Sequence, residues 1–132
     1  FNAQLVICDK FRSKPNVIEE MTVIGDVEGK NVIMIDDLID TAGTICSAAS
    51  ALLDKGAKSV RAFCTHPVLS GNAYERIQNS ALIELVVCDT ITLKEENLRD
   101  KIRVLSVDTI FAEAIRRTHK HQSITSLFNN PY

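Results

Sequence analysis

The chain contains 132 residues, of which 45% are hydrophobic and 24% are charged, and its formal net charge is −2. This length is typical of one compact domain, and so small a net charge argues against a general nucleic-acid-binding or membrane-surface protein. No apolar run approaches the roughly 20 residues that a membrane-spanning helix needs. We therefore expect a single domain over residues 1–132, with neither nucleic acid nor membrane as a partner.

The amino-terminal part of the chain contains two apolar runs of strand length. Residues 3–8 (AQLVIC) predict a first strand, which the polar and basic loop DKFRSKPN follows. MTVIG predicts a short strand, and the continuously apolar residues 31–36 (NVIMID) are typical of a parallel strand buried on both faces. The opening FNAQLVICDK resembles entry into a strand from earlier sequence, so we expect a fragment of a longer protein.

Helical and extended patterns then alternate. Residues 44–55 carry apolar side chains at helical spacing, and residues 59–65 predict the next strand, which His66 and Pro67 end. Ser70 is in position to cap a second helix, which ends near residue 79.

Two more strands are predicted at residues 83–89 and 102–107, and a last helix begins at Asp108 or Thr109 and ends near residue 119. This order of elements predicts an α/β fold with an open, mostly parallel sheet flanked by helices. In such folds ligands bind beyond the carboxyl ends of the strands, in the loops that lead into helices.

The four cysteines are widely spaced and form no CxxC pair, and three of them end apolar runs: LVIC, RAFC and LVVC. This pattern predicts core thiols in a reducing compartment, which favours a cytoplasmic protein. Because metal-ligand spacing is lacking, we expect no zinc site.

The most informative stretch is DDLIDTAGT, where a buried strand leads directly into a helix. A helix N-terminus offers unpaired backbone N–H groups and the positive end of the helix dipole, which together suit a phosphate. Ala42 and Gly43 allow the backbone to approach phosphate oxygens closely, and the Thr41 and Thr44 hydroxyls can donate further hydrogen bonds.

The carboxylates of this stretch suggest that the phosphate is only one end of the ligand. Asp36, Asp37 and Asp40 can accept hydrogen bonds from vicinal sugar hydroxyls or hold Mg²⁺ through water. A sugar phosphate satisfies both halves of the loop. The alternative is purely structural: Asp36 and Asp37 end a strand, and Asp40 or Thr41 caps a helix.

A second cluster consists of Lys10, Arg12 and Lys14 in the loop after the first predicted strand. Clustered cations on a closing loop can neutralise a polyphosphate and stabilise charge that develops during its transfer. The alternative is a solvated loop whose basic residues bind nothing specific.

These stretches resemble one family. VIMIDDLIDTAGT is similar to the binding loop of type I phosphoribosyltransferases and, more closely, of phosphoribosyl-pyrophosphate (PRPP) synthetases. ICDKFRSKPN resembles the catalytic loop of PRPP synthetases, and THPVLSGNAYERI and HQSITSLFN resemble two further segments of that family. The resemblance implies a type I phosphoribosyltransferase-like, Rossmann-like fold.

The resemblance also implies roles for individual residues. Lys10 and Arg12 match catalytic positions, whereas Phe11 stands where the family usually has an arginine, so we expect weaker nucleotide contacts. The residues implied to bind ribose 5-phosphate are Asp36 and Asp37 at its hydroxyls and Asp40, Thr41, Ala42, Gly43 and Thr44 around its phosphate.

Near the carboxyl end, Ser123 and Thr125 match family positions that hold an effector phosphate at a subunit interface. The alternative is a tail that packs Leu127 and Phe128 against the domain.

Carried over, the family reaction transfers the diphosphoryl group of ATP, with Mg²⁺ as cofactor, to the 1-hydroxyl of ribose 5-phosphate and yields PRPP and AMP for nucleotide biosynthesis. The full-length family protein is expected to be a homo-oligomer. Its amino-terminal half supplies most adenine contacts and a metal-associated histidine. We therefore expect this chain to be the carboxyl-terminal, phosphoribosyltransferase-like half of a two-domain parent and to be inactive alone.

Three alternatives remain open. A non-catalytic PRPP-synthetase-associated regulatory protein would share most of these motifs, although the intact Lys10 and Arg12 favour an enzyme. A type I phosphoribosyltransferase should carry a base-binding segment, and none is evident. A response-regulator receiver should carry a later phosphoacceptor aspartate and a lysine, which FCTHP and SVDT fit poorly.

Overall fold

The computed structural model describes residues 3–11, 20–93 and 100–129, and describes only the backbone of Lys10, Phe11, Glu20 and Asn129. In these ranges the main body runs β3 (Asn31–Ile39), α1 (Gly43–Asp54), β4 (Ser59–Pro67), α2 (Ala73–Asn79), β5 (Glu84–Cys88) and β6 (Ile102–Leu105).

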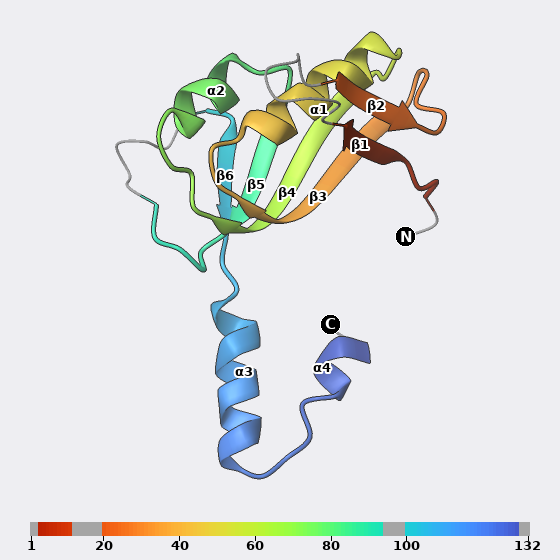
Figure 1. Ribbon diagram of the computed structural model, residues 1–132. Helices are drawn as coiled ribbons and strands as arrows, with labels where there is room; N and C mark the ends of the chain where they lie inside the picture. The colour runs from red at the N-terminus through yellow and green to blue at the C-terminus, as the bar shows by residue number, and fades with distance from the viewer. Residues whose placement is uncertain (1–2, 12–19, 94–99, 130–132) are drawn as a thin grey trace.

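The four strands of this body form one parallel sheet in the order β3-β4-β5-β6. The register aligns Met34 with Ala62, then with Leu85 and Ile102, in one row across the whole sheet. Figure 1 shows α1 and α2 on the same face of this sheet. The predicted α/β class, with a mostly parallel sheet flanked by helices, is confirmed.

The core lies between that face and the two helices. Leu52 of α1, Ile77 of α2 and Leu85 of β5 are completely buried, as are Val60 and Val87 on neighbouring strands. Apolar side chains at helical spacing on α1 therefore meet apolar side chains at alternate positions of the strands, which is the pattern that the sequence predicts.

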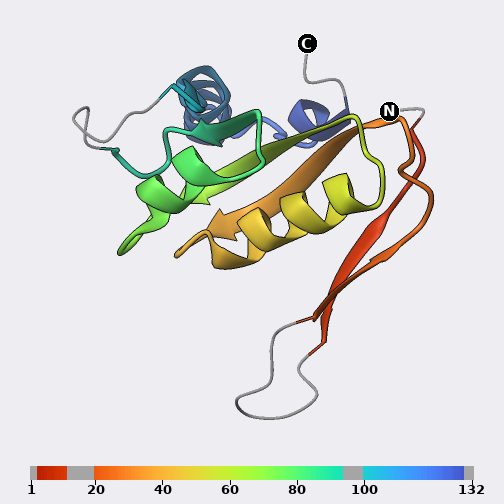
Figure 2. The ribbon, with the colours of Figure 1, turned by 90° about the horizontal axis from the view of Figure 1, so that it is seen from above.

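The first predicted strand differs from its prediction. The extended segment is β1 (Ile7–Phe11), and it pairs with β2 (Glu20–Ile24) in a separate antiparallel ribbon, where Cys8 lies opposite Val23. Figure 2 shows this ribbon diverging from the four-stranded sheet. The apolar run of residues 3–8 has the composition of a core strand, but its partner is the segment that follows in the chain.

Two strands are also longer than predicted. β3 continues past Asp36 to Ile39, and β4 continues to Pro67, which lies opposite Ile39 in the register. Pro67 is tolerated because it is the last residue of its strand, where no further ladder bond needs its missing N–H. Both acidic residues Asp36 and Asp37 therefore lie inside a paired strand.

The last helices are α3 (Asp108–His119) and α4 (Ser126–Asn129), and α3 buries no residue. Figure 1 shows both on the side of the sheet opposite α1 and α2, with α3 extending away from the sheet. Ile35 on that sheet face is 80% exposed, and Ile115 on α3 is 68% exposed. In the part of the chain that the structure describes, no helix has the length and apolar character that a membrane crossing requires.

Candidate functional site

The candidate site is the turn that connects β3 to α1. Ala42 stands at the N-cap of α1 with a left-handed backbone (φ 59°), and no side chain caps the helix. The structural alternative in which Asp40 or Thr41 serves as the cap is therefore wrong. The Asp40 carboxylate instead accepts a hydrogen bond from the Ser70 hydroxyl.

The start of α1 leaves a row of amides available. The first bond of helical type runs from the Cys46 amide to the Ala42 carbonyl (3.1 Å), so the amides of Gly43, Thr44 and Ile45 have no acceptor inside the helix. The first turn of α1 carries no acidic side chain that would offset the positive end of the dipole.

Gly43 leaves space beside this row. A methyl group at Gly43 would lie 3.8 Å from the Thr41 Oγ1 atom and 4.0 Å from the Arg76 Nη1 atom, which are ordinary contact distances. The packing around Gly43 therefore does not require glycine at this position.

The two acidic residues before the turn approach it from different sides. Asp36 lies opposite Cys64 in the register and lines a cavity together with Thr44 of α1. Successive residues of a strand project to opposite faces, so the Asp37 side chain projects to the face away from α1. Both carboxylates can reach one ligand only at the carboxyl edge of the sheet, where the turn lies.

The segment after β4 supports the turn from outside. Ser70 was expected to cap α2, but α2 begins at Ala73 with Asn72 at its N-cap, and the Ser70 hydroxyl bonds to Asp40 instead. The guanidinium of Arg76, on α2, donates from Nη1 to the Thr41 carbonyl (2.8 Å). Sequence reasoning missed Arg76, although it lies in THPVLSGNAYERI.

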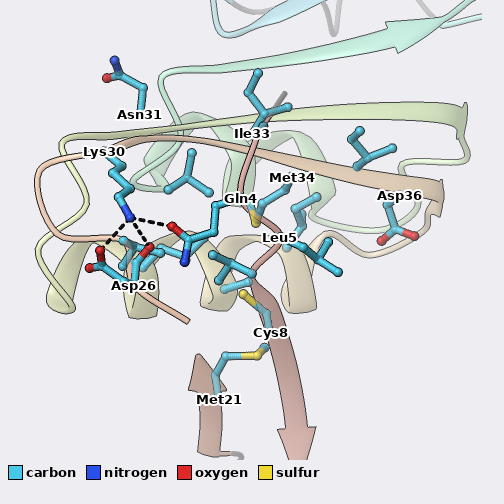
Figure 3. A pocket seen from close by; sticks show the side chains of 18 of the residues that line it. Gln4, Leu5, Cys8, Met21, Asp26, Lys30, Asn31, Ile33, Met34 and Asp36 are labelled. Carbon is cyan, nitrogen blue, oxygen red and sulfur yellow. Dashed lines mark hydrogen bonds and ion pairs between the residues drawn. The ribbon is translucent and has the colours of Figure 1, made fainter. Parts of the chain in front are cut away.

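A cavity of about 560 Å³ lies between residues 3–8, β3 and α1. Figure 3 shows Asp36 at one end and Lys30 at the other, where Lys30 bonds to Gln4 and Asp26. Leu5 and Met34 are among the apolar side chains between them. Such a lining suits apolar groups, so the open turn, and not this cavity, is the site suited to a sugar phosphate.

Polar residues also meet at the carboxyl ends of the next strands. The His66 ring lies 3.0 Å from the Thr90 hydroxyl, which donates to the Thr65 carbonyl (2.7 Å). The Ser106 hydroxyl and the Val107 amide donate to the Asp89 carboxylate and lower its pKa below the ordinary value. These contacts fix the loops that border the site.

The structure describes one of the two predicted catalytic residues. Lys10 lies within β1, where its backbone pairs opposite Met21, and not in the loop where it was expected. Arg12 lies outside the described residues, as does Lys14.

The predicted effector residues lie in one turn between α3 and α4. The Ser123 hydroxyl is 3.1 Å from the Thr125 hydroxyl, and Arg117 donates to the Ser123 carbonyl (3.2 Å). Hydrogen bonds from Arg116 and Arg117 lower the pKa of Glu113 to about 2, so this carboxylate is charged at neutral pH.

All four cysteines are free, and Cys64 is buried while the other three are half-buried. Burial raises the pKa of the Cys8, Cys46 and Cys64 thiols, so these thiols stay protonated and behave as small apolar side chains.

Comparison with known proteins identifies the family. The model of the phosphoribosyl synthetase-associated domain matches residues 6–129. The chain belongs to this family. The resemblance to PRPP synthetases is thereby confirmed.

Curated relatives from several bacteria are named ribose-phosphate pyrophosphokinase. The relative from Halalkalibacterium halodurans is 59% identical over 127 residues, which are 96% of this chain and 40% of that protein. The relative from Campylobacter jejuni is 60% identical over 124 residues, which are 94% of this chain and 40% of that protein. This phosphoribosyl synthetase-associated domain thus spans about 40% of the length of the curated relatives that it matches.

A solved structure has the same fold. The crystal structure of phosphoribosylpyrophosphate synthetase from Mycobacterium smegmatis is similar to this chain with a TM-score of 0.75 and 37% sequence identity. The similarity covers 77% of this chain and 34% of that chain.

Replacement of Gly43 by alanine should separate folding from ligand binding. We expect the free energy of unfolding to stay within about 1 kcal/mol of the value for the unaltered chain, because alanine has a higher helix propensity than glycine. Affinity for ribose 5-phosphate should fall about tenfold, since the methyl occupies the approach of the ligand. Chemical denaturation and calorimetric titration measure the two effects.

Gly29→Ala is the matched control. Gly29 has a positive φ of 67° with no atom within 4 Å of an added methyl, so its replacement should cost roughly 1–2 kcal/mol of stability and leave affinity unchanged. An unaltered affinity in Gly43→Ala would contradict the close approach of a ligand at Gly43.

Proposed function

We propose that this chain is the ribose-5-phosphate-binding half of a ribose-phosphate pyrophosphokinase and forms the carboxyl-terminal domain of a two-domain parent. The observation that carries the proposal is the turn after β3. In this turn Ala42 has a left-handed backbone, and α1 begins directly after it with amides that have no acceptor inside the helix. The first turn of α1 carries no acidic side chain, and two carboxylates precede the turn. The names of the curated relatives support the same reaction.

In this proposal the two ends of the ligand meet two kinds of group. The phosphate is bound by the amides from Thr41 to Thr44 and by the hydroxyls of those two threonines. The ribose hydroxyls donate to Asp36 and Asp37 at the strand end. A phosphate dianion is attracted by the positive end of the helix dipole, and neutral hydroxyls can donate hydrogen bonds to the carboxylates. One sugar phosphate can therefore bind both parts of the turn.

The carboxylates of this site suit a Mg²⁺ ion that is coordinated by both the protein and the substrate. No group of three or more metal-ligating side chains exists among the residues described. Mg²⁺ commonly binds through one or two carboxylates plus substrate phosphates, and Asp36 and Asp37 are exposed carboxylates at the strand end. Bound there, the ion would neutralise charge on the phosphate oxygens.

The proposed reaction is attack by the 1-hydroxyl oxygen of ribose 5-phosphate on the β-phosphorus of ATP. A new C1–O–P bond forms, the bond between the β-phosphorus and the bridging oxygen of AMP breaks, and the hydroxyl proton is released. Lys10 and Arg12 would stabilise the charge that passes to the leaving oxygen. ATP and ribose 5-phosphate are thus the proposed partners, within a homo-oligomer of the full-length protein and in the cytoplasm.

Two other functions share the sugar-phosphate turn. A non-catalytic regulatory partner of PRPP synthetase would bind the same ligand without turnover, and a type I phosphoribosyltransferase would consume PRPP. The curated relatives named as pyrophosphokinases favour the enzyme over both. Ser123 and Thr125, beside Arg117, remain the proposed effector contacts.

Titration of the ¹⁵N-labelled chain with ribose 5-phosphate tests the proposed site. We expect the amide signals of residues 40–45 to shift most, because the phosphate would accept hydrogen bonds from them. Ribose without phosphate, at the same concentration, is the control and should leave these signals unmoved. Shifts confined to α3 and α4 would contradict the proposal.

A second test concerns turnover by the chain alone. The chain spans about 40% of its curated relatives, and the family resemblance assigns most adenine contacts to the other part. We expect AMP release from Mg-ATP and ribose 5-phosphate to fall at least about a hundredfold below that of a full-length relative, because the reactants are not held together. AMP release at the rate of a full-length relative would refute the half-site proposal.

A further inference from the structure

The segment between β4 and α2 makes an unusual set of contacts with the candidate site. The Leu69 amide donates to the Ile39 carbonyl (3.1 Å), and the Ser70 amide donates to the Asp40 carbonyl (3.0 Å). Leu69 is buried and has a left-handed backbone (φ 46°), so this segment is held firmly against the end of β3.

Arg76, on α2, continues the same series. Its Nη1 atom donates to the Thr41 carbonyl at 2.8 Å, across a sequence separation of 35 residues. Three successive carbonyls, those of residues 39, 40 and 41, therefore accept hydrogen bonds from one segment, residues 69–76. We call these contacts the α2 clasp.

The clasp sets the direction of the amides on the other side of the turn. In a planar trans peptide, the carbonyl of one residue and the N–H of the next point in opposite directions. A Thr41 carbonyl held toward Arg76 therefore turns the Ala42 amide away from α2. The same relation turns the Thr41 and Asp40 amides away, so that they extend the row of free amides at the start of α1.

The clasp also controls the nearest negative charge. The Ser70 hydroxyl donates to Oδ1 of Asp40, which draws this carboxylate toward α2. A carboxylate that faced the amide row would repel a phosphate. Because the Asp40 carboxylate lies on the α2 side, this repulsion is weaker. Asp40 thus contributes to the turn through its backbone amide, while its carboxylate bonds to Ser70.

We propose that Arg76 and Ser70 are positioning residues, which hold the turn of residues 40–44 in its anion-binding conformation. This role rests on the proposed function, because ribose 5-phosphate is the anion for which the turn is held. Arg76 acts on the Thr41 carbonyl, and Ser70 acts on both the carbonyl and the carboxylate of Asp40.

The test compares Arg76→Met, Arg76→Lys and Ser70→Ala in the 132-residue chain. Methionine keeps much of the aliphatic stem but donates no hydrogen bond, whereas lysine restores a cationic donor. We expect Arg76→Met to weaken ribose 5-phosphate binding about tenfold and Arg76→Lys to recover most of that loss. Ser70→Ala should weaken binding about fivefold, because the Asp40 carboxylate is released.

Arg103→Met is the matched control, since Arg103 lies on β6 and pairs with Glu84 at 3.4 Å. It should change neither affinity nor the amide signals of residues 41–44. Chemical denaturation identifies any variant that fails to fold. If Arg76→Met fails, the comparison of Ser70→Ala with the unaltered chain decides the role of the clasp.

The outcomes separate the clasp from the proposed function. Unaltered binding in Arg76→Met and Ser70→Ala would overturn the clasp and leave the proposed function intact. A chain that does not bind ribose 5-phosphate at the turn would overturn the proposed function. In that case the role of the clasp is tested by spectra of the ¹⁵N-labelled chain without ligand. Arg76→Met must then move the amide signals of residues 41–44, and Arg76→Lys must return them toward their original positions.

Discussion

The turn between β3 and α1 depends on one residue that has the backbone conformation of a glycine and the side chain of an alanine. Ala42 has a φ of 59°, which costs an L-residue roughly 1–2 kcal/mol. Ala42 is only 4% exposed and belongs to the hydrophobic core. Burial of the methyl offsets part of this cost, and the left-handed step allows a strand end and a helix start to present their amides together.

The surrounding elements hold this turn at both ends. Pairing of β3 with β4 extends to Ile39, and the buried face of α1, with Ile45 and Leu52, fixes where the helix begins. The carbonyls that would otherwise need solvent are bonded to the segment before α2 and to Arg76. The parallel sheet thus does more than support the site, because its register decides where the turn starts and what lies beside it.

Some of these features were predictable from local sequence and others depend on distant contacts. The run NVIMID predicts a strand, and Ile45, Ala48 and Leu52 recur at helical spacing, so β3 and α1 were both anticipated. The prediction that this strand is buried on both faces is wrong for the chain described, since Ile33 and Ile35 are 55% and 80% exposed. Ser70 was misassigned as a helix cap, because its hydroxyl bonds to Asp40, which lies 30 residues earlier. Composition likewise does not distinguish a core strand from a ribbon strand, so the antiparallel pairing of β1 was missed.

The most direct measurement for this account is a crystal structure of the chain grown with ribose 5-phosphate. The account predicts phosphate oxygens within about 3 Å of the amides of residues 41–44, with Ala42 still left-handed. It also predicts the ribose hydroxyls toward Asp36 and Asp37. A sugar phosphate bound along the apolar cavity beside β3, with the amides of the turn unoccupied, would contradict it.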